Sequence, residues 1–190
     1  MPPIRVFVDL DEVLEDFTGA ALRLHGYTRE SFEKLRTPGV YDITKPLKMT
    51  LEEFNKPINE MGEAFWLGLA PLPWHRELVN LVERWVKKEW YILTSTMDYV
   101  GEESGKKKWC KRLLGRNFDR IIITKHKHVM SMPSSILIDD NPTNIYNWEG
   151  DDDYNTGEGF LFPSWGNGLY KVADHPLDTI RRNFHEYFAG

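Results

Sequence analysis

The chain has 190 residues, of which 41% are apolar and 13% aromatic, which is enough to build a folded core and excludes a disordered chain. Its formal net charge of −5 excludes a general attraction to nucleic acid or to an anionic membrane, so we expect neither as a stable partner. One cysteine excludes an internal disulfide, and no apolar run approaches the roughly 20 residues of a membrane span. We therefore expect a reduced, cytoplasmic protein.

Five short apolar segments are typical of strands that are covered on both faces. In chain order they are residues 4–10, 90–94, 120–124, 135–138 and 159–162. Segments with helical apolar periodicity follow or separate them, at 76–88, 107–114 and 176–188. This alternation predicts an α/β fold with a doubly wound, mostly parallel sheet. We interpret the basic run at 106–108 as a solvated helix face.

Residues 18–74 separate the first two expected strands and break the alternation. They contain no convincing strand and are predicted to form helices, at 19–25, 28–35 and 50–61. Thr50 and Glu53 form a capping box that marks the start of the last of these helices. The connection is too long for a crossover. It therefore predicts a helical cap, inserted at 18–74 into a core formed by residues 1–17 and 75–190.

Four pairs of polar residues follow the expected strands. In chain order they are Asp9 with Asp11, Thr94 with Ser95, Lys125 with Lys127, and Asp139 with Asp140. In a parallel sheet these ends meet in one crevice, where ligands of open α/β sheets bind. Unpaired carboxylates would repel one another there, and oxygen ligands favour Mg²⁺ as the cation that resolves the repulsion. The Thr94 hydroxyl and Lys127 would then bind the remaining oxygens of a phosphorylated substrate.

This series of motifs resembles the haloacid dehalogenase superfamily of phosphotransferases, whose signature is D-x-D-x-[TV], a strand-ending Thr or Ser, a Lys and paired acids. The resemblance implies that Asp9 is a nucleophile that forms an aspartyl-phosphate, with Asp11 as general acid and then general base. It implies that Asp9, the backbone carbonyl of Asp11, and Asp139 bind Mg²⁺, while Asp140 holds a metal-bound water. Two residues would stabilise the transferring phosphoryl group, Thr94 and Lys127.

The motifs are more closely similar to those of the 5′(3′)-deoxyribonucleotidases. The pattern D-x-D-G-V-L-x-D-F corresponds to residues 9–17, and an aromatic stretch with x-L-x-P-L-P corresponds to 65–73. The patterns C-T-S and L-I-D-D-R-P correspond to 93–95 and 137–142. The resemblance implies a nucleoside monophosphate whose base lies between two aromatic rings and whose phosphate is assisted by a serine; these residues are Phe17, Trp66 and Ser95. Glu12 replaces Gly and Asn141 replaces Arg, which leaves the nucleotide preference open.

Several alternatives stay open. Phe17 and Trp66 also suit an apolar hinge that closes the cap, and Tyr41 is a third candidate for contact with the base. Lys125 faces the same side of an extended segment as Lys127 and is a second candidate for the phosphate. The competing functions are a phosphatase of the same superfamily for another small phosphate ester, and a nucleotide-binding regulator with weak catalysis. The oligomeric state, including a homodimer, is not determined by the sequence.

Overall fold

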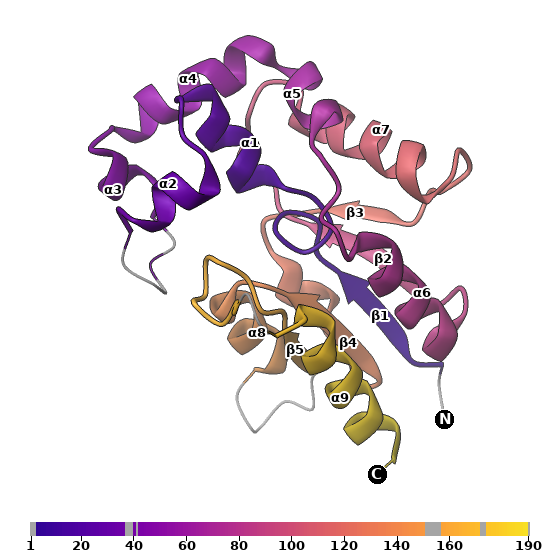
Figure 1. Cartoon of the computed structure of the whole chain (residues 1–190). Helices are drawn as coiled ribbons and strands as arrows, with labels where there is room; N and C mark the ends of the chain where they lie inside the picture. Colours follow the sequence, from indigo (N-terminus) through magenta and orange to yellow (C-terminus); the bar gives the residue numbers. More distant parts are fainter. Residues whose placement is uncertain (1–2, 37–39, 41, 151–156, 172–173, 190) are drawn as a thin grey trace.

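The computed structural model describes residues 3–36, 40, 42–150, 157–171 and 174–189. Within this part of the chain the strands are β1 (Arg5–Val8), β2 (Trp90–Thr94), β3 (Ile121–Ile123), β4 (Ser135–Asp139) and β5 (Glu158–Leu161). They form a sheet of order β3-β2-β1-β4-β5 in which every pairing is parallel (Figure 1). The predicted doubly wound parallel sheet is confirmed.

The helices agree with most of the predicted segments. They are α1 (Phe17–Leu24), α2 (Arg29–Glu33), α3 (Thr44–Leu47), α4 (Leu51–Met61), α5 (Glu63–Gly68), α6 (His75–Val86), α7 (Glu102–Leu114), α8 (Pro142–Glu149) and α9 (Pro176–Ala189), with a 3-10 turn η1 (Lys127–Met130). Helix α7 begins at Glu102 and not at residue 107 as predicted. Helices α3, α5 and α8 are additions to the prediction. No described helix has the length and the apolar character that crossing a membrane requires.

Side chains of the sheet alternate between two apolar layers. Val6 and Val8 of β1 belong to the larger layer, which also contains residues of α6 and α9. Phe7, between them, belongs to the opposite layer, where the ring of Trp148 from α8 lies 5.2 Å from its ring centroid. Because helices cover both faces, the strands are nearly continuous apolar runs in the sequence.

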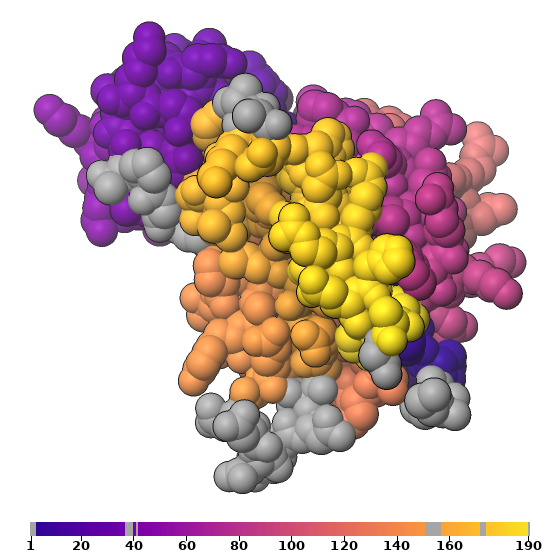
Figure 2. All heavy atoms as spheres, turned by 60° about the horizontal axis from the view of Figure 1, so that its bottom comes forward, coloured from indigo at the N-terminus to yellow at the C-terminus, as the bar shows by residue number. Residues whose placement is uncertain are grey.

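Helices α1 to α5 lie together beyond the carboxyl ends of the strands (Figure 1). Their purple atoms form a lobe beside the orange and yellow body of the molecule (Figure 2). The capping box predicted at the start of α4 is confirmed. The Glu53 backbone N–H donates to Thr50 Oγ1 over 3.1 Å, and the Thr50 backbone N–H donates to Glu53 Oε2 over 2.8 Å.

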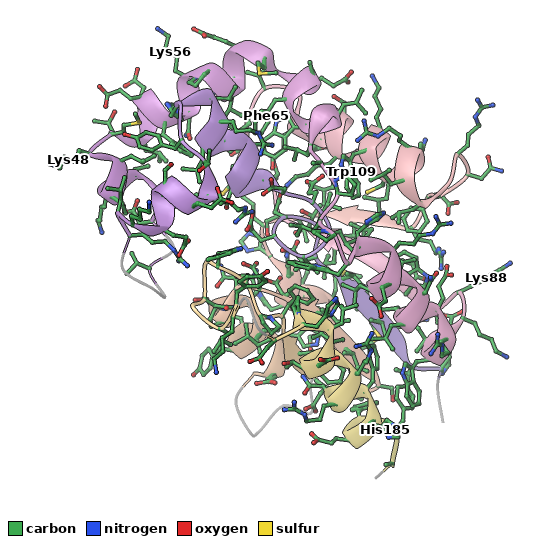
Figure 3. All side chains as sticks on the ribbon, viewed as in Figure 1. Lys48, Lys56, Phe65, Lys88, Trp109 and His185 are labelled. Atoms are coloured by element: carbon green, nitrogen blue, oxygen red, sulfur yellow. The ribbon has the colours of Figure 1, made fainter. Side chains whose placement is uncertain are left out.

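Helix α5 crosses α7 at very short range, which requires glycine at two positions of the segment 101–105. A Cβ on Gly105 would lie 2.4 Å from Cβ of Trp66, and a Cβ on Gly101 would lie 2.3 Å from the backbone nitrogen of Glu63. The Trp109 indole N–H donates to the carbonyl of Leu69 over 2.9 Å, just beyond α5. Figure 3 shows Phe65 and Trp109 inside the molecule, whereas the labelled lysines extend outward, at positions Lys48, Lys56 and Lys88.

Candidate active site

The ends of β1 and β4 bring two carboxylates side by side. Val8 lies opposite Ile138 in the parallel register, so Asp9 and Asp139 follow at the same level of the sheet. Lys127, the first residue of η1, lies between them, with Nζ 2.7 Å from Asp9 Oδ1 and 2.6 Å from Asp139 Oδ2. All three side chains are buried. Burial opposes a charged lysine, but the two carboxylates raise the pKa of Lys127 above its ordinary value, so the ammonium stays protonated.

Three carboxylates at this point suit a hard divalent cation. Asp9, Asp139 and Asp140 each offer an oxygen, and these oxygens all lie within 4.8 Å of one another. Neighbouring side chains hold two of them in place: the Asn144 amide donates to Asp139 Oδ2 over 3.0 Å, and the Ser164 hydroxyl donates to Asp140 Oδ2 over 2.9 Å. Carboxylate oxygens in such a set are the ligands that Mg²⁺ prefers.

Within the described part of the chain, this cluster contains three carboxylates and pairs with one cation, Lys127. Burial, together with the neighbouring Asp139 and Asp11, raises the pKa of Asp9 to about 7 even though Lys127 opposes the shift. Burial, with repulsion from Asp139 and Asp9, also raises the pKa of Asp140 well above its ordinary value. A divalent cation would favour the ionised carboxylates again, so these residues fit a metal site.

Asp11 is held by a lysine of helix α7. Lys106 is 1% exposed and donates from Nζ to Asp11 Oδ2 over 2.7 Å and to Glu102 Oε1 over 2.9 Å. Burial opposes its charge, but the two carboxylates raise the pKa of Lys106 above its ordinary value. The predicted solvated helix face is therefore wrong for Lys106, although its neighbours Lys107 and Lys108 are exposed.

The sequence did contain a signal for this buried lysine. Lys106 precedes Trp109, Cys110 and Leu113 by three, four and seven residues, which places it on the apolar stripe of α7 and not on the solvated face. Glu102 lies four residues before it, at the spacing of a helical ion pair. The prediction used neither clue, because it assigned the whole basic run 106–108 to one solvated face and left Glu102 outside the helical segment 107–114.

Thr94 and Ser95, at the end of β2, meet the same lysine. Lys106 Nζ lies 3.3 Å from Thr94 Oγ1, and it donates to the carbonyl oxygen of Ser95 over 2.8 Å. The Thr94 hydroxyl also lies 3.4 Å from Asp11 Oδ2. Thr94 and Ser95 therefore lie beside Asp11, and Lys106, which was predicted to lie on a solvated helix face, joins all three.

The loop after β2 is shaped by the buried carboxylate of Glu102. Its Oε2 accepts hydrogen bonds from the backbone N–H groups of Met97 and Tyr99, over 2.9 and 3.2 Å. The Tyr99 hydroxyl donates to Asn55 Oδ1 of α4 over 2.8 Å, and burial raises the pKa of Tyr99 to about 12, so the phenol stays neutral. Glu102 thus links Lys106 to a loop that also contacts the helical lobe.

A second ionic cluster joins helix α2 to the loop after β1. Arg29 Nη2 lies 2.9 Å from each oxygen of Glu12, and Arg29 Nε donates to Asp16 Oδ1 over 2.9 Å. The Thr18 backbone N–H donates to Glu12 Oε1 over 2.8 Å. Glu12 has φ of 60°, in the left-handed region that glycine adopts without strain. The glutamate charge is therefore matched by an arginine of the helical lobe.

A cavity of about 270 Å³ lies between the sheet and the helical lobe. The lining contains residues of the cluster around Lys127, the pair of Glu12 and Arg29, and several aromatic rings. The charged and polar lining residues include Asp9, Asp11, Asp140, Lys127, Glu12, Arg29 and Ser95. The aromatic ones include Phe17, Phe32, Trp66, Tyr99 and Trp165. The lining of the cavity is therefore partly polar and charged and partly aromatic.

Phe17 and Trp66 come together, but not as a sandwich. Their rings are nearly parallel, with an interplanar angle of 14° and centroids 5.5 Å apart. A ring inserted between them needs about 7 Å, twice the carbon–carbon contact distance. Trp66 is 1% exposed, and Lys106 Nζ lies 5.0 Å from its ring centroid. The predicted base site between the two rings is therefore corrected: in this arrangement only Phe17 has exposed ring surface to offer.

Lys125, the second candidate for the phosphate, is not part of this site. Lys125 is exposed and pairs with the exposed Asp98, while Lys127, two residues later, is buried in the central cluster. Lys125 is therefore not found among the cavity-lining residues. The segment turns into η1 after β3, so the two lysines do not share one side as an extended chain would require. Tyr41, the third predicted contact for the base, lies outside the described residues.

Comparisons with known proteins agree with these motifs. Residues 2–156 match the family model described as 5′ nucleotidase, deoxy (pyrimidine), cytosolic type C protein. The chain is 30% identical over 152 residues to a human protein named 5′(3′)-deoxyribonucleotidase, cytosolic type. That match covers 74% of this chain and 72% of the human protein.

Two solved structures show more distant likenesses. A phosphonoacetaldehyde hydrolase-like protein from Oleispira antarctica has a TM-score of 0.45 and 11% identity, over 99% of this chain and 84% of its own. A haloacid dehalogenase family enzyme from Bacteroides thetaiotaomicron, in a magnesium complex, has a TM-score of 0.41 and 16% identity, over 87% and 96%. With TM-scores this low, neither structure bears on the function of this chain.

Proposed function

The chain belongs to the family described as 5′ nucleotidase, deoxy (pyrimidine), cytosolic type C protein, a family of haloacid dehalogenase-type phosphatases, and on this basis we propose that it is a Mg²⁺-dependent 5′(3′)-deoxyribonucleotidase. The proposed reaction is hydrolysis of (deoxy)nucleoside monophosphates. The observation that carries the proposal is the buried cluster in which Lys127 pairs with Asp9 and Asp139 beside Asp140, at the floor of an aromatic-lined cavity.

Asp9 is the proposed nucleophile. Its carboxylate oxygen attacks the phosphorus atom, forming an aspartyl-phosphate while the ester P–O bond breaks. Lys127 holds the carboxylate in place through its 2.7 Å ion pair and adds a positive charge where the phosphoryl oxygens gather. Asp9, Asp139 and Asp140 would hold Mg²⁺, whose charge offsets that of the phosphate oxygens and of the carboxylates themselves.

Asp11 is the proposed general acid and base. It gives its proton to the departing ester oxygen, and afterwards takes a proton from the water that hydrolyses the aspartyl-phosphate. The 2.7 Å bond from Lys106 to one oxygen fixes the orientation of this carboxyl group. The other oxygen, Oδ1, is buried. The Asp11 carboxyl group also lies beside the buried Glu15, whose pKa is raised well above its ordinary value by burial and by Asp11. Thr94 and Ser95 are proposed to bind the phosphate from the next strand end.

The helical segment 18–74 is the proposed cap, and 1–17 with 75–190 the proposed core. The cap would cover the nucleotide and exclude water during phosphoryl transfer. Phe17 is proposed to contact the base with its exposed surface, while Trp66 supports it from behind through the stacked contact of 5.5 Å between centroids. The substrate is then a small molecule, and we propose a cytoplasmic location, in keeping with the cytosolic human relative.

The proposal is tested by release of inorganic phosphate from purified protein with and without Mg²⁺. The substrates are dUMP, dTMP, UMP and ribose 5-phosphate. We expect hydrolysis of the nucleotides that needs Mg²⁺ and is lost in Asp9→Asn. Equal rates with ribose 5-phosphate would instead support a phosphatase for other small esters. Tight binding of nucleotides without any phosphate release would support the regulator, and retained turnover in Asp9→Asn would exclude Asp9 as the nucleophile.

A further inference from the structure

Glu12 keeps a backbone conformation that disfavours any side chain. Its φ of 60° lies in the left-handed region, and the resembling nucleotidase pattern has glycine at this position. The side chain is nevertheless well ordered by contacts: both carboxylate oxygens pair with Arg29, and Oε1 also accepts from the Thr18 backbone N–H. With 12% of the Glu12 side chain and 17% of the Arg29 side chain exposed, the pair is largely but not fully covered.

The hydrogen bonds of this pair leave some positions unused. An ionised carboxylate has about four acceptor positions, and among the described residues Glu12 uses three, two on Oε1 and one on Oε2. Arg29 donates from Nε and Nη2, and no bond from its Nη1 is found within the described part of the chain. Counting only partners in the described part of the chain, one acceptor position on Glu12 and two donors on Arg29 are available to a ligand.

The pair also lies where a ligand would meet it. Glu12 and Arg29 both line the cavity that contains Asp9 and Asp11. Asp11 is the proposed proton donor to the ester oxygen, and that oxygen is bonded to the sugar of a nucleotide. Glu12 directly follows Asp11 in the chain and lines the same cavity, so a sugar attached to the leaving oxygen would bring its hydroxyl groups close to Glu12. A hydroxyl group donates one hydrogen bond and accepts others, which matches the free positions of the pair.

We propose that Glu12 and Arg29 form a sugar-reading pair that binds ribose hydroxyl groups of the nucleotide. This inference rests on the proposed nucleotidase function and changes its preference: substrates gain affinity with each sugar hydroxyl. Ribonucleotides are then accepted at least as well as the deoxyribonucleotides for which the family is named. Glycine at position 12 cannot make this contact, because it has no side chain.

The alternative role for the pair is a latch that only fixes helix α2 to the loop after β1. A latch would affect all substrates equally, since it makes no contact with them. A sugar-reading pair instead changes the affinity of each substrate according to the number of hydroxyl groups on its sugar. The ratio between two substrates that differ only in these groups therefore separates the two roles, whereas overall activity does not.

The test compares three substrates that share base and phosphate: UMP, dUMP and 2′,3′-dideoxy-UMP. KM is measured for the wild type, Glu12→Gly, Glu12→Gln and Arg29→Met, with the exposed Glu103→Gln as control. For the wild type we expect KM to rise with each missing hydroxyl, by about tenfold or more in total, as for a hydrogen bond to a charged group. In Glu12→Gly, at a position where glycine is unstrained, the ratio of KM for 2′,3′-dideoxy-UMP to KM for UMP should fall to near one. Glu12→Gln should keep part of this ratio.

A second measurement separates this inference from the proposed function. Binding of the three nucleotides with Mg²⁺ is measured by calorimetry in Asp9→Asn, with and without Glu12→Gly. If phosphate is released but the substrate ratios are the same in Glu12→Gly and the wild type, the sugar-reading pair is refuted and the nucleotidase stands. If no variant releases phosphate but Glu12→Gly removes the binding ratio, the pair is supported and the nucleotidase is refuted. Equal binding of all three nucleotides refutes the pair in either case.

Discussion

Lys106 donates a hydrogen bond to Asp11 over 2.7 Å and so connects helix α7 to the loop after strand β1. The ammonium group of Lys106 also donates hydrogen bonds to the Glu102 carboxylate and to the backbone oxygen of Ser95. A lysine that is 1% exposed and bonded in this way holds its carboxylate partner in one position. The pair therefore couples the proposed acid and base to a helix that carries no other proposed catalytic group.

Replacement of Lys106 by Met should damage both folding and turnover. The change leaves the buried Glu102 and the partly exposed Asp11 without their counter-ion, which costs about 3–5 kcal/mol in the free energy of unfolding. It also releases Asp11, so kcat should fall by about 100-fold or more. Denaturant unfolding and single-substrate kinetics measure the two effects. Lys107→Met, on the exposed side of the same helix, is the control and should change neither; unchanged kcat in a folded Lys106→Met would contradict the role given to Lys106.

Phe17 and Trp66 should differ sharply when each is replaced by Ala. Phe17→Ala removes the exposed ring surface, so KM for dUMP should rise by about tenfold, as expected from a lost base contact of about 1–3 kcal/mol. KM for ribose 5-phosphate, which has no base, should stay the same. Trp66→Ala should instead lower the free energy of unfolding by about 3–5 kcal/mol, because that ring is buried. A stable Trp66→Ala protein with the nucleotide defect would reverse the two assignments.

Replacement of Asp139 by Asn should weaken metal binding without changing the shape of the site. The amide keeps the size of the side chain but loses the charge that faces the other two carboxylates. The Mg²⁺ concentration for half-maximal activity should rise by about tenfold or more. Titration of activity with MgCl₂ measures it. Asp98→Asn, which alters only an exposed ion pair with Lys125, should give the wild-type titration curve.

The metal-free protein should lose stability as the pH rises through neutrality. The folded-state pKa of Asp9 is raised to about 7, and that of Asp140 is also raised, so between the ordinary carboxyl pKa and about 7 the folded chain binds more protons than the unfolded chain. Each such group therefore contributes stability at low pH that is lost as the pH rises through its folded pKa, at most about 1.4 kcal/mol per pH unit.

Mg²⁺ should offset this loss, because it binds the ionised carboxylates. Thermal unfolding with and without MgCl₂, at about pH 6 and about pH 8, tests both statements. We expect the rise in Tm caused by Mg²⁺ to be larger at the higher pH, and Mg²⁺ binding to release protons at the lower one. A Mg²⁺ effect on Tm that is independent of pH would show that Asp9 and Asp140 are already ionised in the metal-free protein.

The sheet could be predicted from the sequence because its determinants are local. Each strand is a short apolar run that ends in polar residues, and the parallel register then brings Asp9 and Asp139 together. The capping box of Thr50 and Glu53 is likewise complete within four residues, so its geometry follows from spacing alone.

Contacts between distant segments could not be predicted in the same way. Arg29 pairs with Glu12 only because α2 folds back over the loop after β1, and nothing within either short segment indicates the other. The stacking of Phe17 on Trp66 depends on the packing of α1 against α5, so the sequence could place both rings near the cavity but could not show that they touch. For Lys106, an error of a few residues in the start of α7 was enough to turn a buried ion pair into an apparent surface lysine.

The close crossing of α5 and α7 has a consequence for any opening of the lobe. A Cβ at Gly105 would clash with Trp66, so the close contact of these two helices depends on glycine at this position. We expect α5 to travel with the core and the preceding helices to swing, about a pivot at Gly62, whose φ of 55° already marks a sharp bend between α4 and α5. The entrance for a ligand would then widen on the side of Arg29, while the side lined by Trp66 and Glu102 stays still.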